Sequence, residues 1–235
     1  MINGFLSVGN ALVLDRLIRT TKSNKIIFDS RSSNVIISLV TDDFSHFTKI
    51  SFENTFFSSL KTSNDFVILP LISFYKPFMR VMQIIQSKET TELRYELSFN
   101  NKAVKYRKIF YNLKKSEFDF KFKCWNSINV DFLALKNVLK RFRDDFIELR
   151  IGDKFEIIER NTKVILKQKE GVLTDSVNLS TLTDKFKVDL KTFKEILEVI
   201  DLFEESSFCL AGLKEPINII FRNSNIIFST YVSTM

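Results

Sequence analysis

The chain contains little glycine, histidine or cysteine, and each scarcity argues against a class of protein. Its five glycines do not match the spacing of a phosphate-binding or dinucleotide-binding loop. The single histidine, His46, leaves a serine or cysteine hydrolase only one possible imidazole base. The two cysteines, Cys124 and Cys209, fit no metal-ligand or redox spacing and are typical of a reducing compartment. We therefore predict a protein that is not an enzyme and needs no cofactor.

Long apolar runs are also missing. No segment approaches the run of about 18 apolar residues that a membrane-spanning helix needs. The first apolar stretch, residues 11–14, ends at Asp15 and Arg16, so we expect no signal peptide, an intracellular protein and no membrane partner. Hydrophobic residues still make up 45% of the chain, and 25 residues are Phe, which is enough for a packed core.

Positive charge is concentrated in the first half of the chain. The formal net charge is +7, and residues 1–115 contain 17 Lys and Arg against 9 Asp and Glu. The second half is close to neutral. This asymmetry favours a surface that faces a polyanion, although a basic half can also serve solubility alone.

Four segments show apolar residues at helical spacing, separated by about 60 residues. They cover residues 9–20, 73–87, a stretch that begins at Asp131, and 189–201. Asp131 is a plausible N-cap, and Pro77 fits the second segment only if a helix begins near it. Strand-like runs rich in β-branched and aromatic residues fill the gaps.

This alternation predicts an α+β fold with two similar domains, each with two helices packed on antiparallel sheet. We place domain 1 at residues 1–123, a connector at 124–130 and domain 2 at 131–235. Basic residues lie opposite the apolar stripe in three of the four helices, whereas the last helix mixes lysines with Glu195 and Glu198. One such face is usually a solvated surface, but its repetition favours sequence-independent contacts with DNA phosphates.

The strand over residues 117–123 has the strictest alternation in the chain. Phe118, Phe120 and Phe122 lie on one side, and charged residues lie on the other. Its phenylalanines are either ordinary core or part of an edge strand that pairs with another subunit. Both readings can hold, because side chains can pack inward while the backbone ladder stays open.

Three acidic pairs allow a different class of function. Asp42-Asp43, Asp144-Asp145 and Glu204-Glu205 could contribute to a Mg²⁺ site in a metal-dependent nuclease. Each pair stands where a strand or helix is expected to end, and adjacent acids there are usually solvated turn residues. We therefore predict no metal site and keep the nuclease as an alternative.

The chain as a whole resembles the sliding clamps of the proliferating cell nuclear antigen family, and more closely the Rad-nine subunits of the nine-one-one DNA-damage checkpoint clamp. The resemblance is strongest from Phe186 onward, where Phe228-x-x-Tyr231-Val232-Ser233-Thr234 is similar to the closing strand of Rad-nine proteins. Residues 54–60, Asn-Thr-Phe-Phe-Ser-Ser-Leu, resemble the paired-aromatic segment of those proteins. The order and spacing of elements carry this resemblance, rather than a rigid motif.

The resemblance implies a nuclear, heterotrimeric checkpoint ring around double-stranded DNA, joined to two other clamp subunits. A clamp loader would place the ring on DNA, and the ring would recruit checkpoint and repair proteins. The DNA-facing residues would be Arg16, Arg19, Lys22, Lys76, Arg80, Lys136, Lys140, Arg143, Lys191 and Lys194. The subunit-interface residues would be Phe118, Phe120, Phe122, Val172, Val177 and Leu179, on edge strands 117–123 and 172–179. A homotrimeric replication processivity clamp is the alternative within the same fold.

Overall fold

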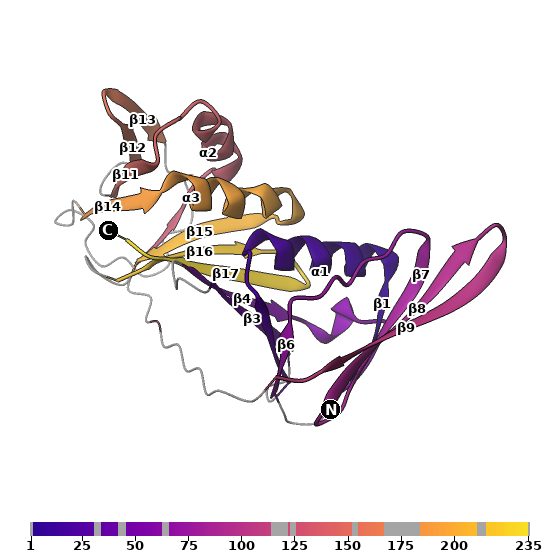
Figure 1. The fold of residues 1–235 in the computed structure, drawn as a ribbon. Helices are drawn as coiled ribbons and strands as arrows, with labels where there is room; N and C mark the ends of the chain where they lie inside the picture. Colours follow the sequence, from indigo (N-terminus) through magenta and orange to yellow (C-terminus); the bar gives the residue numbers. More distant parts are fainter. Residues whose placement is uncertain are drawn as a thin grey trace. The chain divides into compact units, whose positions relative to one another are not determined.

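A computed structural model describes residues 2–30, 34–41, 46–62, 66–113, 122, 126–151, 155–166, 184–210 and 215–234. Over these residues, three α-helices and a larger number of antiparallel strands confirm the α+β fold class (Figure 1). The longest of these helices has 13 residues, and none in the described ranges combines the length and hydropathy of a membrane span. The chain divides into two compact units, one with residues up to 118 plus Ser224–Phe228 and one with the rest.

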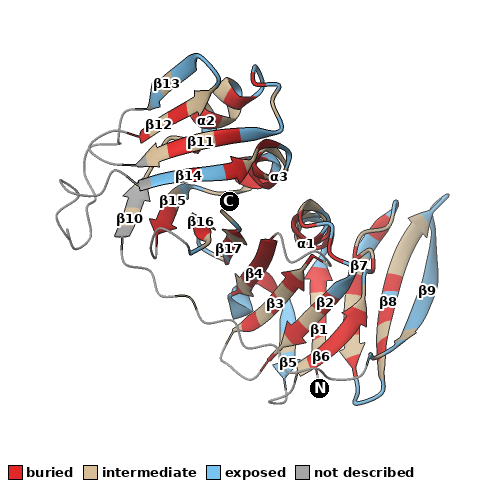
Figure 2. Ribbon diagram, turned by 60° about the vertical axis from the view of Figure 1, so that its left-hand side comes forward, coloured by how far each residue is buried: buried red, intermediate tan, exposed pale blue. Residues whose placement is uncertain are grey.

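The first unit contains one α-helix in its described part. Its elements are β1 (Ile2–Ser7), α1 (Val8–Thr20), β2 (Lys25–Asp29), β3 (Val35–Val40), β4 (His46–Phe52), the short 3-10 helix η1 (Asn54–Phe56), β5 (Ser59–Thr62), β6 (Phe66–Pro70), β7 (Met79–Gln86), β8 (Thr90–Phe99) and β9 (Lys102–Tyr111). Helix α1 lies on β1 and β7 and buries Leu14, Leu17 and Ile18 (Figure 2). One sheet has the order β5-β1-β7-β8-β9, and a second contains the run β4-β3-β2-β6, with the first residues of β17 (Ile226–Val232) beside β4.

The second unit repeats this plan. Its elements are β10 (Asn126–Asn129), α2 (Phe132–Leu139), β11 (Phe146–Ile151), β12 (Phe155–Glu159), β13 (Thr162–Leu166), β14 (Asp184–Asp189), α3 (Leu190–Ile196), the 3-10 helix η3 (Leu197–Leu202), β15 (Glu205–Leu210), β16 (Ile217–Arg222) and β17 (Ile226–Val232). The strand orders are β10-β15-β16-β17 and β13-β12-β11-β14. They match β1-β7-β8-β9 and β4-β3-β2-β6 position by position, which is the duplication that the helix spacing indicates.

Each α-helix begins at a side chain that accepts a backbone N–H of its first turn. Ser7 accepts from Asn10 at 3.2 Å, Asp131 from Ala134 at 3.0 Å and Asp189 from Thr192 at 2.6 Å. An N-cap of this kind satisfies one of the four N–H groups that have no partner inside the helix. The predicted cap at Asp131 is therefore confirmed.

The predicted helix over residues 73–87 is wrong. Residues 71–76 are irregular, a turn follows, and Met79–Gln86 form strand β7. The pattern misleads because apolar residues in β7 fit both periods, while burial shows the alternation of a strand at Met82, Ile84 and Gln86. Phe78 has a φ of 62°, which a helix cannot accommodate. We call residues 71–78 the strap, and it occupies the place in unit 1 that α3 has in unit 2.

Two smaller expectations also differ from the structure. Residues 126–129, predicted within the connector, form β10 and pair with β15. Cys209 is fully buried and disulfide-bonded, whereas the sequence suggests reduced cysteines. Both differences arise from contacts between residues that are distant in sequence, and the spacing of residues along the chain does not show such contacts. Most of the predicted edge strands, residues 117–121 and 172–179, lie outside the described residues.

Candidate nucleic-acid interface

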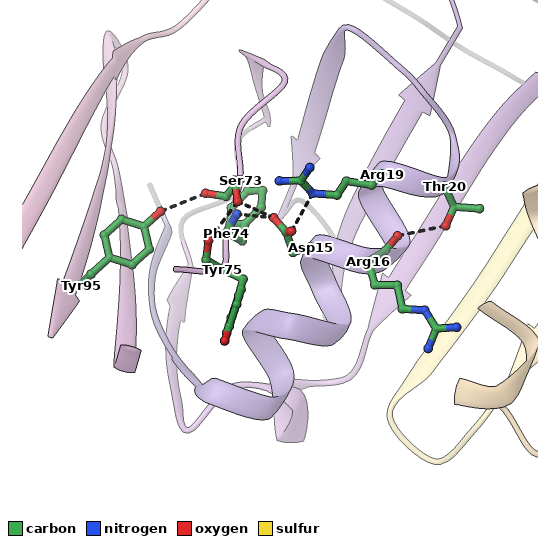
Figure 3. Close-up of polar contacts among 8 residues, drawn as sticks. All are labelled: Asp15, Arg16, Arg19, Thr20, Ser73, Phe74, Tyr75 and Tyr95. Carbon is green, nitrogen blue, oxygen red and sulfur yellow. Dashed lines mark hydrogen bonds and ion pairs between the residues drawn. The ribbon is translucent and has the colours of Figure 1, made fainter. Parts of the chain in front are cut away.

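Helix α1 carries two of the predicted DNA-facing residues, and they point to different sides of the helix (Figure 3). The Arg19 side chain is 64% exposed, and its Nε donates to Oδ2 of Asp15 at 2.7 Å. Arg16 points away from that ion pair, and its carbonyl accepts from the Thr20 hydroxyl at 2.9 Å. Lys22 is exposed just after the helix, with a φ of 48°.

Asp15 connects α1 to the strap. Besides the bond from Arg19, its Oδ1 accepts from the Ser73 hydroxyl at 2.9 Å and from the Phe74 N–H at 2.7 Å (Figure 3). Asp15 is only 8% exposed, so these bonds compensate the cost of burying a carboxylate. The sequence shows Asp15 only as the end of an apolar run, because the groups that it binds are 58 and 59 residues away.

Tyr95 holds the same strap from the sheet. Its hydroxyl donates to the Ser73 carbonyl at 3.0 Å, and its side chain is almost completely buried. Burial, followed by the neighbouring Tyr106 and the charge of Asp15, raises the pKa of Tyr95 above its usual range. Folding therefore favours the neutral phenol.

This raised pKa predicts a loss of stability in alkali. Below the unfolded-state pKa of about 10, the contribution of Tyr95 is fully present. As the pH rises further toward the folded-state pKa, the unfolded chain releases a proton that the folded chain retains, so the free energy of unfolding falls. A Tyr95→Phe variant should lose about 1 kcal/mol at pH 8 through its missing hydrogen bond and show a shallower decline above pH 10. Urea titrations at pH 8 and 10.5 measure both effects, and equal declines in the two proteins would contradict the assignment.

Lys76 and Arg80 lie on different elements, Lys76 on the strap and Arg80 on β7. Lys76 Nζ lies 5.4 Å from the ring centroid of Tyr106, in a cation–π contact. Arg80 donates to the Ser98 hydroxyl at 3.0 Å. Because side chains alternate along β8, Ser98 faces away from the side where buried Tyr95 meets the strap. The structure therefore does not group Arg80 with Lys76.

Unit 2 uses two of its predicted DNA-facing lysines to join its helices. Lys136 Nζ lies 3.1 Å from a carboxylate oxygen of Glu198, and Lys194 Nζ donates to the Phe142 carbonyl at 2.8 Å. Both lysines are only partly exposed. The remaining three cations of the predicted set in this unit are exposed, and they are Lys140, Arg143 and Lys191. Lys140 Nζ donates only to the neighbouring exposed Asn137 side chain, at 3.3 Å, so among the described residues of the predicted set these three are the ones in unit 2 whose exposure suits a phosphate contact.

Two solved structures align with essentially the whole chain. PCNA from Thermococcus kodakaraensis aligns over 100% of both chains, with a TM-score of 0.74 and 12% identity. The chain has the sliding-clamp fold. A PCNA2–PCNA3 complex from Sulfolobus tokodaii aligns over 99% of this chain and 98% of its own, with a TM-score of 0.73 and 10% identity. No protein-family model and no curated protein sequence matches the chain.

Within the described part of this clamp fold, β9 and β13 each end a sheet. Strand β9 is the most exposed, with cationic side chains at Lys102, Lys105, Arg107 and Lys108 (Figure 2). Strand β13 exposes Ile165 and Lys163, and Lys163 contacts Glu156 on β12. An end strand has unpaired N–H and C=O groups that can pair with another chain.

Of the six predicted interface residues, the structure describes one, Phe122. The half-buried ring of Phe122 packs edge-on against Tyr231 with centroids 4.9 Å apart. Phe118, Phe120, Val172, Val177 and Leu179 lie outside the described residues. The sequence analysis does not identify β9 as an edge strand, although four cations and no acid within its ten residues are a local signal of an exposed strand.

The acidic pairs form no metal centre within the described residues. Over those ranges, no group of three or more His, Cys, Asp or Glu could hold an ion. Asp144 forms an ion pair with Arg160, and its N–H donates to Glu159 at 2.7 Å, so this pair belongs to a turn. The backbone N–H of Glu204 donates to the Arg222 carbonyl at 3.0 Å. Asp42-Asp43 lies outside the described ranges.

Proposed function

We propose that this chain is a non-enzymatic subunit of a nuclear, heterotrimeric checkpoint clamp that encircles double-stranded DNA. The observation that carries the proposal is the clamp fold, which aligns with a PCNA structure over the full length of both chains. A ring holds DNA by topology, so its phosphate contacts can be individually weak. In this role the chain would be placed on DNA by a clamp loader and would recruit checkpoint and repair proteins.

The charges on the end strands β9 and β13 favour assembly with other kinds of subunit rather than with further copies of this chain. The four cations of β9 are accompanied by no acid on that strand, and the described side chains of β13 include Lys163 and no acid. Pairing β9 of one copy with β13 of another would therefore bring no direct charge complementarity. A strand with acidic side chains suits β9 better, which supports a heteromer over the homotrimeric replication clamp.

Gel filtration of the purified chain tests the assembly. We expect a monomer alone, and a ring only after addition of the two clamp subunits that co-purify with it from its native cell. The assembled ring should stay on a nicked circular plasmid and leave when the plasmid is made linear. A stable trimer of the lone chain would support the replication clamp instead.

Charge reversal of exposed helix residues tests the DNA-facing side. Lys140→Glu together with Lys191→Glu should weaken duplex binding by the assembled ring and reduce the slope of log affinity against log salt by about 0.9 for each phosphate that the ring no longer neutralises. The matched control is Lys61→Glu on β5, an exposed lysine outside the predicted set. Equal effects of control and double variant would contradict the placement.

A further inference from the structure

The two faces of the β8–β9 hairpin differ in charge. Leu93 and Tyr95 are buried on the face that meets α1 and the strap, and their pairing partners Lys108 and Tyr106 share that face. Along the hairpin this face carries Lys102 and Lys108 and no acid. The opposite face mixes both signs, with Glu92, Arg94, Glu96, Lys105 and Arg107. A hydrogen bond from Arg94, together with the charges of Arg94 and Arg107, lowers the pKa of Glu92.

Aromatic rings are exposed on the acid-free face. Phe78 is 66% exposed, Phe99 is 56% exposed and Tyr106 is 42% exposed. The rings of Phe78 and Phe99 meet edge to face, with centroids 5.8 Å apart. We call these three rings with Lys76 and Lys102 the aromatic platform. Exposed apolar groups gathered in this way are typical of an interaction surface.

The backbone holds the platform in a strained arrangement. Phe78 adopts a φ of 62° in a turn that the Met79 N–H closes by donating to the Lys76 carbonyl at 3.3 Å. Glycine is the usual residue at such a position, and a bulky side chain there is an outlier. Asn100 and Asn101, both with positive φ, form the tight turn that follows Phe99. Local strain of this kind is most often found at functional sites.

We propose that the aromatic platform binds single-stranded DNA. Unpaired bases would stack on the Phe78, Phe99 and Tyr106 rings, and the lysines would contact the phosphates. A face with cations and no acid suits a polyanion, whereas the bases of a duplex are already stacked and cannot reach exposed rings. The choice of DNA rests on the proposed clamp function, and the binding of a single strand goes beyond it.

Fluorescence anisotropy of a labelled oligothymidine with the full chain tests the platform. Phe99→Ala should weaken binding between about 5-fold and 150-fold, the range measured when one stacked base loses its ring. Tyr111→Ala is the matched control, since Tyr111 is 81% exposed on the opposite face of β9 and should leave binding unchanged. Lys102→Ala should lower the salt slope by about 0.7, and Lys105→Ala should not.

Phe78→Gly separates binding from folding. Glycine removes the strain of the positive φ, so the melting temperature should rise by about 2–4 °C while binding weakens as in Phe99→Ala. No binding of oligothymidine by the wild-type chain, or equal losses in the control variants, would overturn the platform. A Phe99→Ala chain that no longer assembles with its partner subunits would also overturn it, in favour of a protein contact.

These outcomes are independent of the clamp function. A ring that is retained on circular duplex while the wild-type chain ignores oligothymidine refutes the platform alone. Binding of oligothymidine by a chain that never forms a ring refutes the clamp alone and supports the platform.

Discussion

Replacing Phe208 with alanine is expected to lower the free energy of unfolding of unit 2 by about 3–5 kcal/mol. Phe208 is fully buried on β15, and its ring centroid lies 4.6 Å from that of Phe132, 5.1 Å from Phe155 and 6.0 Å from Phe193. One ring thus joins α2, β12 and α3. Its removal leaves a cavity where these three elements meet, and aromatic pairs add about 0.5–1.5 kcal/mol each beyond burial.

Urea unfolding followed by far-ultraviolet circular dichroism measures this loss. Leu133→Ala is the control, because Leu133 lies on the same helix α2 as Phe132 but is 59% exposed, and its change should stay within about 0.5 kcal/mol. Since the chain has two units, Phe208→Ala should advance the transition of unit 2 first. Unfolding curves that coincide with those of the wild type would contradict the central place of this ring.

Asp15→Ala is expected to cost about 3–5 kcal/mol. Three donors converge on the Asp15 carboxylate, and hydrogen bonds to a charged group contribute about 1.5–3 kcal/mol each, with the exposed Arg19 contributing least. The variant leaves the Phe74 N–H buried without its acceptor, and the strap loses its attachment to α1. Lys76, which belongs to the strap, would then no longer be held over Tyr106.

Two further variants separate the causes of that loss. Arg19→Ala removes only the exposed ion pair and should change the free energy of unfolding by less than about 1 kcal/mol. Asp15→Asn keeps one acceptor oxygen without the charge, so its cost should fall between the two. An Asp15→Ala protein as stable as Arg19→Ala would show that the strap is held by other contacts.

Helical and alternating periodicity is enough to predict the fold class and three of the helices. The sequence predicts the starts of α2 and α3 because Asp131 and Asp189 precede apolar stripes. It predicts the strands of unit 2 because β-branched residues alternate with polar ones. The structure of segment 73–87 cannot be predicted in this way, because its apolar residues fit both periods. The contact that decides it, between Asp15 and Phe74, joins residues that are distant in sequence.

The DNA-facing prediction was limited in the same way. Helical spacing identifies which lysines lie opposite an apolar stripe, but not which have an acceptor nearby. Lys136 and Lys194 contact Glu198 and the Phe142 carbonyl, 62 and 52 residues away, and no local pattern indicates those partners. Lys140 and Lys191 are members of the set for which exposure agrees with the spacing.

Strand β17 is shared between the two units, and this has a consequence for synthesis of the protein. Ser224–Phe228 belong to unit 1, where β17 adjoins β4 and the Asn225 carbonyl accepts from the Glu53 N–H at 2.9 Å. A ribosome that has released residues 1–118 has therefore not yet supplied the strand that covers β4. Until translation reaches residue 228, the edge of β4 in the nascent N-terminal half stays unpaired. Such an edge is prone to aggregation and is a binding site for chaperones.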